Sequence, residues 1–207
     1  NKHLITLTDE NTEFIQLIPL YWKDDATYEL ERWILKLRSH PALENIDYTY
    51  VTRIHTDNDS VWSEDCAVFQ AMIERVGSIV MIYADPTDHA RDNCRAEKSN
   101  QLVEGGIRSI LFDRNLGPTW WQKAATDVQE LAALFPPISS SGTVSVDGDR
   151  ASPIELLLHG YVSRNEVYRR LDSYVQVGTP ALCHLKDVKG SDLECKARWG
   201  ISIGRSG

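Results

Sequence analysis

The sequence contains no uninterrupted run of about 20 apolar residues, the length that a helix needs to cross a bilayer, so an integral membrane protein is not expected. It also lacks G-x-G-x-x-G, P-loop, G-x-S-x-G and H-E-x-x-H motifs. No C-x-x-C pair is present either. The common signatures of nucleotide binding, serine hydrolysis, zinc proteolysis and thiol redox chemistry are therefore absent.

The composition is that of a globular protein with an acidic surface. Hydrophobic residues make up 42% of the 207 residues and charged residues 25%, which excludes a wholly disordered chain. The net charge is −8, and it is uneven: residues 1–150 carry 14 basic and 24 acidic side chains, whereas residues 151–207 carry 8 and 6. Such a surface repels phosphates on most faces, so nucleic acid is not an expected partner.

Strand-like and helix-like segments alternate through the first part of the chain. Apolar spacing predicts helices after Asp24, after Ser63 and from Trp121 onwards, and β-branched or continuous apolar runs predict strands at 46–54, 78–84 and 107–112. This alternation is typical of an α/β fold, in which a largely parallel sheet carries helices on both faces. We predict that fold for residues 1–137, with the 78–84 strand central and buried on both faces.

The sequence changes character after Pro136-Pro137. Residues 138–151 are rich in Ser, Gly and Asp and predict a loop or hairpin linker. Two capping boxes follow, Ser152 to Glu155 and Ser163 to Glu166, and these predict two short helices before β-structure near 181–203. We therefore expect residues 152–207 to form a small α+β subdomain packed on the first domain.

The four cysteines favour disulfides. Cys94 lies in a very polar segment, where a free thiol would be exposed and reactive. Cys183 and Cys195 flank a turn-like stretch, so a bridge could join the arms of a hairpin. We predict the pairs Cys66–Cys94 and Cys183–Cys195, and Asn58 begins a glycosylation sequon. Together with an N-terminal Asn in place of Met, these features favour a secreted protein.

Polar residues follow each of the three predicted strands. Ligands in parallel sheets bind beyond the carboxyl ends of the strands, so these residues would converge on one edge. Carboxylates there could hold Mg²⁺ or Ca²⁺, with histidine as the acid–base partner. The candidate catalytic residues are His55, Asp85 and His89, and the candidate metal ligands are Asp57, Asp59, Asp88 and Asp113. The alternative is that these residues serve only as turn and cap residues.

Three functions are compatible with these patterns. The first is a secreted, disulfide-stabilised effector or toxin-like protein that binds a protein or other macromolecule outside the cell and needs no cofactor. The second is a metal-assisted hydrolase that uses the strand-end residues with Mg²⁺ or Ca²⁺. The third is an intracellular interaction module with free cysteines, in which case the location is cytoplasmic.

Overall fold

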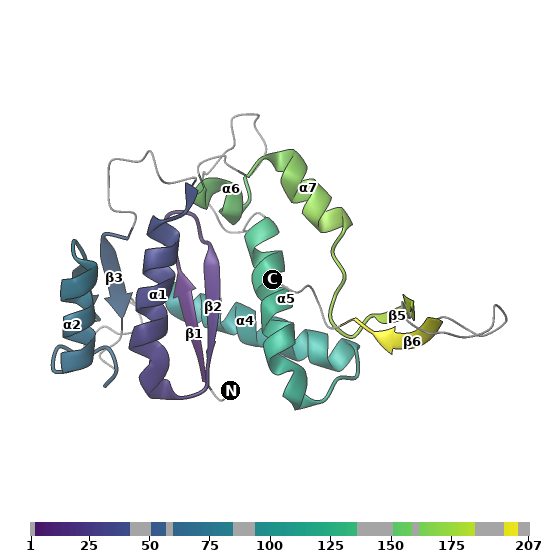
Figure 1. Cartoon of the computed structure of the whole chain (residues 1–207), viewed down its shortest axis with the longest axis horizontal. Helices are drawn as coiled ribbons and strands as arrows, with labels where there is room; N and C mark the ends of the chain where they lie inside the picture. Colours follow the sequence, from purple (N-terminus) through teal and green to yellow (C-terminus); the bar gives the residue numbers. More distant parts are fainter. Residues whose placement is uncertain are drawn as a thin grey trace.

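The computed structural model describes residues 3–41, 51–56, 60–84, 94–135, 151–158, 162–184 and 197–202. Within them the strands form three separate two-stranded sheets, β1–β2, β3–β4 and β5–β6. The largely parallel sheet with helices on both faces, predicted for residues 1–137, is therefore wrong. The described part of the chain is rich in helix. The sheets β1–β2 and β3–β4 lie among the helices, whereas β5–β6 lies apart from them (Figure 1).

The chain begins with an antiparallel hairpin that the strand and helix pattern did not reveal. Strand β1 (His3–Thr8) pairs with β2 (Ile15–Leu20), with Ile5 opposite Ile18. Asp9 organises the turn, because its carboxylate accepts hydrogen bonds from the Thr12 backbone N–H at 2.8 Å and hydroxyl at 2.6 Å. The alternating buried residues of β2, Ile15 and Leu17, place one face of this hairpin in the core.

The next unit contains the one parallel pair of strands among the described residues. After a 3₁₀ turn, η1 (Lys23–Asp25), come helix α1 (Ala26–Arg38), β3 (Arg53–Thr56), α2 (Ala67–Val76) and β4 (Val80–Tyr83). β3 and β4 run parallel, as predicted, but among the described residues β3 overlaps the predicted 46–54 strand only at Arg53 and Ile54. However, β4 is not a central strand buried on both faces, since Val80 is 60% exposed. With β3 as its one partner among the described residues, β4 lies at a sheet edge.

Helices α1 and α2 enclose an apolar core. It is built from buried residues spaced three or four apart on each helix: Leu30, Ile34, Phe69, Met72 and Val76. Arg38, at the end of α1, closes this unit. Its guanidinium donates to the backbone oxygens of Val76 at 2.6 Å, Gly77 at 3.2 Å and Val51 at 3.3 Å. One side chain thus joins α1 to the end of α2 and to the segment that enters β3.

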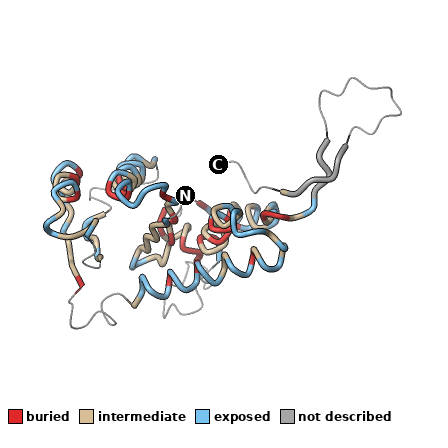
Figure 2. The backbone as a smooth tube through the Cα atoms, turned by 90° about the horizontal axis from the view of Figure 1, so that it is seen from below, coloured by how far each residue is buried: buried red, intermediate tan, exposed pale blue. Residues whose placement is uncertain are grey.

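The predicted strand at 107–112 is helical and belongs to the long helix α4 (Cys94–Asp113). A short apolar run has the same composition in a strand and in a buried helix, which explains the error. The inward face of α4 instead follows helical spacing, with Ser99, Val103 and Ile110 buried. Buried segments recur at intervals along the helices with exposed segments between them (Figure 2), as one-sided packing requires.

Helix α5 (Trp121–Leu134), preceded by the 3₁₀ turn η3 (Pro118–Trp120), packs along α4 and β2. A close approach between the helices occurs at Gly106 of α4, where a Cβ atom would lie 2.8 Å from Val128 Cγ2 of α5. Val103, Ile110, Ala124 and Val128 are buried in the shared core together with Ile15 and Leu17 of β2.

The C-terminal elements largely follow the sequence-based expectation. Glu155 accepts from the Ser152 backbone N–H and hydroxyl and so completes the capping box of α6 (Pro153–Leu157). Ser163 accepts from the Glu166 backbone N–H at the start of α7 (Arg164–Asp172). Strands β5 (Pro180–His184) and β6 (Ala197–Ile201) then form an antiparallel pair that extends away from the helices (Figure 1). Of the predicted linker 138–151, all but Ala151 lies outside the described residues.

Asp127, on α5, is buried with 3% of its surface exposed. Its carboxylate accepts from the Val177 backbone N–H at 2.6 Å and thereby fixes the chain that leads into β5. Burial raises the pKa of Asp127 above its ordinary value, and the hydrogen bond from Val177 offsets part of that rise.

This balance predicts opposite outcomes for two substitutions. Because the folded pKa is raised, the ionised form costs stability once the pH rises through that pKa, and no cost arises below the unfolded pKa. Asp127→Asn keeps an acceptor oxygen without the charge, so it is expected to equal or exceed the parent in stability at pH 7 and to match it at pH 3. Asp127→Ala leaves the Val177 N–H unpaired and is expected to cost about 1–3 kcal/mol at both pH values. Urea unfolding at the two pH values measures this, and equal losses for Asn and Ala at pH 7 would contradict it.

Candidate functional site

A cleft separates β1 from β3. Two adjoining cavities, of about 530 and 600 Å³, lie between these strands, and Thr6, Leu7, Ile54, His55 and Ala96 line both. Residues of β1 form one side of both cavities and residues of β3 form the other. Helix α1 contributes Leu30 to both cavities, and the first turn of α4 contributes Ala96. The cleft is therefore a single depression walled by two strands and two helices.

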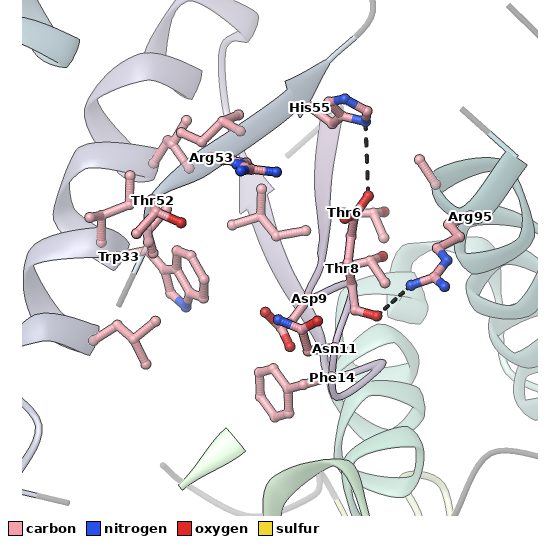
Figure 3. Close-up of a pocket in the computed structure, with 18 of the residues that line it drawn as sticks. Thr6, Thr8, Asp9, Asn11, Phe14, Trp33, Thr52, Arg53, His55 and Arg95 are labelled. Atoms are coloured by element: carbon pink, nitrogen blue, oxygen red, sulfur yellow. Dashed lines mark hydrogen bonds and ion pairs between the residues drawn. The ribbon is translucent and has the colours of Figure 1, made fainter. Parts of the chain in front are cut away.

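Polar residues gather where β1 ends (Figure 3). His55 Nδ1 of β3 lies 3.9 Å from Glu10 Oε1, and the Arg95 guanidinium of α4 donates a hydrogen bond to the Glu10 backbone oxygen. His55 and Glu10 are 40% and 67% exposed, so their ion pair, which forms when His55 is protonated, contributes little to stability. These contacts bring together the turn after β1, the strand β3 and the first turn of α4.

The carboxyl end of β3 opens into the other cavity. Thr56, the last residue of β3, lines it together with Glu97 and Asn100 of α4. Glu97 lies in the first turn of α4, where the helix dipole favours a negative charge. Glu104, two turns along the same face, is paired with Arg108 at 2.8 Å. No ion pair engages the Glu97 carboxylate within the described part of the chain, and the residue is exposed.

The structure places two of the predicted site residues. His55 lines the cleft, but it is the third residue of β3 and does not lie beyond the end of a 46–54 strand, where it was expected. Asp113 ends α4, and at 1.5 Å per residue it is about 24 Å along the helix from Glu97. Asp113 was expected beside the other candidates because a strand was predicted at 107–112. Since that segment is helical, the expectation is wrong. The other candidates lie outside the described residues: Asp57, Asn58, Asp59, Asp85, Asp88 and His89.

Sequence reasoning missed Glu97, although a usable signal was present. An acidic residue in the first turn of a helix that follows a strand points toward the strand's carboxyl end. From its composition the segment 88–104 is expected to be a weakly amphipathic helix, which puts Glu97 in its middle; the observed α4 spans Cys94–Asp113 and has Glu97 in its first turn. Among the residues that the structure describes, no group of three or more His, Cys, Asp or Glu could hold a metal ion.

Cys66 and Cys94 are free thiols in this structure. Cys66 is the N-cap residue of α2 and Cys94 begins α4. In the C-terminal pair, Cys183 lies opposite Arg198 in the β5–β6 register, and Cys195 lies outside the described residues. Both disulfides and the glycan on Asn58 stay predictions.

Comparison with known proteins informs the fold. No family model and no curated protein matches the chain. One solved structure that matches is described as "CryoEM structure of simian T-cell lymphotropic virus intasome in complex with PP2A regulatory subunit B56 gamma". The match to one of its chains has a TM-score of 0.53 at 13% sequence identity, and it covers 74% of this chain and 47% of that chain. At this identity the likeness concerns the fold alone, and the matched region is about half of the neighbour's length.

Within the described ranges, no helix combines the length and the apolar character needed to pass through a membrane.

Proposed function

We propose that this chain belongs to a divalent-cation-dependent enzyme that cuts or transfers phosphodiester bonds in nucleic acid, with Asp57 and Glu97 as cation ligands. The observation that carries the proposal is the position of Glu97, which faces the same cavity as Thr56 at the carboxyl end of β3. Asp57 is the next residue in the sequence and lies outside the described residues, so its part rests on the sequence-based prediction of a metal ligand.

The donor chemistry fits such a cation. Carboxylate and amide oxygens are the ligands that Mg²⁺ takes in proteins, and the Glu97 carboxylate and Asn100 amide both line this cavity. Bound there, a divalent cation would supply charge stabilisation and an activated water for attack on phosphorus. Arg95 and Lys98 flank Glu97 on α4, and Lys23 lines the cavity. These cations offer local contacts to phosphate on a chain whose overall charge is −8.

The proposal also takes up the fold comparison: this chain shares its fold with one chain of a structure described as a viral intasome in complex with a PP2A regulatory subunit. This proposal departs from the expectation based on net charge, because a local basic surface can hold a backbone that the rest of the surface repels. The secreted, disulfide-stabilised binder remains a prediction from the cysteine pattern and the sequon.

The proposal is tested with the purified chain, a labelled DNA duplex, and Mg²⁺ or Mn²⁺. We expect cation-dependent cleavage that Glu97→Gln lowers by about 100-fold or more, since loss even of outer-shell partners costs roughly 10–100-fold. Glu104→Gln on the same helix face is the matched control and is expected to leave the rate within about twofold. The reaction is followed on a denaturing gel, with chelator as the blank.

Two results would overturn the assignment. One is cleavage that Glu97→Gln leaves at the parent rate, which would identify a contaminating nuclease. The other is the absence of both cleavage and Mn²⁺ binding by calorimetry in a chain with parental circular dichroism.

A further inference from the structure

Two aromatic rings lie on the surface at the connection between β2 and α1. Tyr21 and Trp22 are 62% and 63% exposed. Their ring centres are 5.6 Å apart, and the ring planes are inclined by 65°. In this edge-to-face arrangement the two rings do not stack on each other, so ring faces stay open to a third aromatic group. Two adjacent rings left in water indicate a surface that a ligand covers.

The pair borders the cavity that contains the proposed cation site. Leu20 ends β2 and Lys23 begins η1, and both line the second cavity together with Glu97. Tyr21 and Trp22 are the two residues between Leu20 and Lys23. β2 and β3 run in the same direction in Figure 1, so this connection lies on the side of the molecule toward which the carboxyl end of β3 points. A nucleic-acid strand held at the cation would therefore pass beside the two rings.

The surroundings of the rings fit a nucleobase better than an apolar protein surface. Lys23, Asp24 and Asp25 follow the pair directly, and all three are exposed. Charged residues are depleted in the cores of protein interfaces, so these residues disfavour an apolar protein partner. A nucleobase presents its π-face to an aromatic ring while its polar edges stay in water, and it can therefore stack beside charged groups. The Asp25 carboxylate accepts a hydrogen bond from the Trp22 backbone N–H at 3.3 Å, which keeps this negative charge at the main chain.

We infer that Tyr21 and Trp22 form a stacking platform for an unpaired nucleobase of the nucleic-acid substrate. The inference rests on the proposed enzymatic function, because it concerns the nucleotide beside the bond that is cut. The bases of an intact duplex stack on each other, so an unpaired base is the one that lies against the rings. The preferred substrate therefore has a single-stranded segment next to the cleaved phosphodiester bond. Because every base has a π-face, the platform imposes little sequence preference.

The test measures the binding of fluorescently labelled DNA by anisotropy in the presence of a chelator, so that neither the cation nor cleavage contributes. One probe is a blunt duplex, and the other is the same duplex with a single-stranded tail of about six nucleotides. We expect Trp22→Ala to weaken binding of the tailed duplex by roughly tenfold, as the loss of one stacked base predicts, and to leave binding of the blunt duplex within about twofold. Tyr168→Ala removes an exposed ring from α7, and as the matched control it is expected to change neither affinity.

Trp22→Phe separates stacking from a structural role. It keeps an aromatic ring, so its affinity for the tailed duplex should stay within about threefold of the parent. The quenching of tryptophan fluorescence by the tail should nevertheless be smaller than in the parent. Equal affinity of Trp22→Ala and the parent for the tailed duplex, or equal losses for the tailed and blunt duplexes, would overturn the inference.

Glu97→Gln distinguishes the platform from the enzymatic function. It removes a proposed cation ligand and leaves both rings in place, so it is expected to bind the tailed duplex as the parent does. Cleavage that depends on Glu97 while binding of the tail is independent of Trp22 would reject the platform alone. Trp22-dependent binding of the tail in a chain without cation-dependent cleavage would reject the enzymatic function alone.

Discussion

Gly106→Ala is expected to destabilise the protein by about 1–3 kcal/mol, the usual cost of forcing an extra methyl group into a packed core. The new Cβ atom would lie 2.8 Å from Val128 Cγ2 and 3.2 Å from Val128 Cγ1. Valine has little rotamer freedom in a helix, so α4 and α5 would have to move apart. That movement would loosen the core that both helices share with β2.

The neighbouring glycine provides an internal control. Gly105 lies in the same helix, and a Cβ atom built there has no atom within 4 Å. Gly105→Ala is therefore expected to stabilise the protein by roughly 0.5–1 kcal/mol, since alanine reduces the entropy lost on forming a helix. Chemical unfolding of the two variants should move the midpoint in opposite directions. A stabilising Gly106→Ala would show that α4 and α5 do not approach closely at this position.

Phe69→Ala is expected to cost about 3–5 kcal/mol, a large part of the stability of a domain of this size. Phe69 is fully buried on α2, and its ring meets Trp62 edge-on with the ring centres 5.3 Å apart. The substitution removes this aromatic contact and leaves a cavity among Leu30, Ile34 and Met72. The expected result is a lower unfolding midpoint with an unchanged dependence on urea concentration.

Val68→Ala tests whether the loss is specific to the core. Val68 is adjacent on the same helix but 65% exposed, so its truncation should change the stability by less than about 0.5 kcal/mol. Similar losses for Val68→Ala and Phe69→Ala would contradict the assignment of the inward face of α2.

Helices were more predictable from the sequence than sheets. The spacing of Leu30 and Ile34 predicted α1, and the capping pair Ser152 and Glu155 predicted α6, because both signals act within a few residues of the chain. The hairpin of β1 and β2 was not predicted, since its stability comes from pairing and from packing on α4 and α5. The segment 107–112 was assigned to a strand because a short apolar run is equally compatible with a buried strand and with a buried stretch of helix.

The site was predictable only in part for the same reason. His55 was singled out because it follows the β-branched run 46–54, whereas the observed strand β3 spans Arg53–Thr56 and contains His55 itself. Glu97 was missed because its proposed role as a cation ligand depends on where α4 begins and on which strand end that first turn meets. Asp113 was included because three strands were assumed, and its actual position at the far end of α4 follows from the helix being 20 residues long.

The three hydrogen bonds of Arg38 have a consequence for cooperativity. The acceptors come from the end of α2 and from the entry to β3, whereas the donor belongs to α1. If α1 or one of the two acceptor segments detached, the hydrogen bonds between Arg38 and that segment would break, and the freed carbonyl oxygens would need water as a partner. Local opening in this region therefore involves the segments together, as one unit with a common opening free energy, and not as independently fraying pieces.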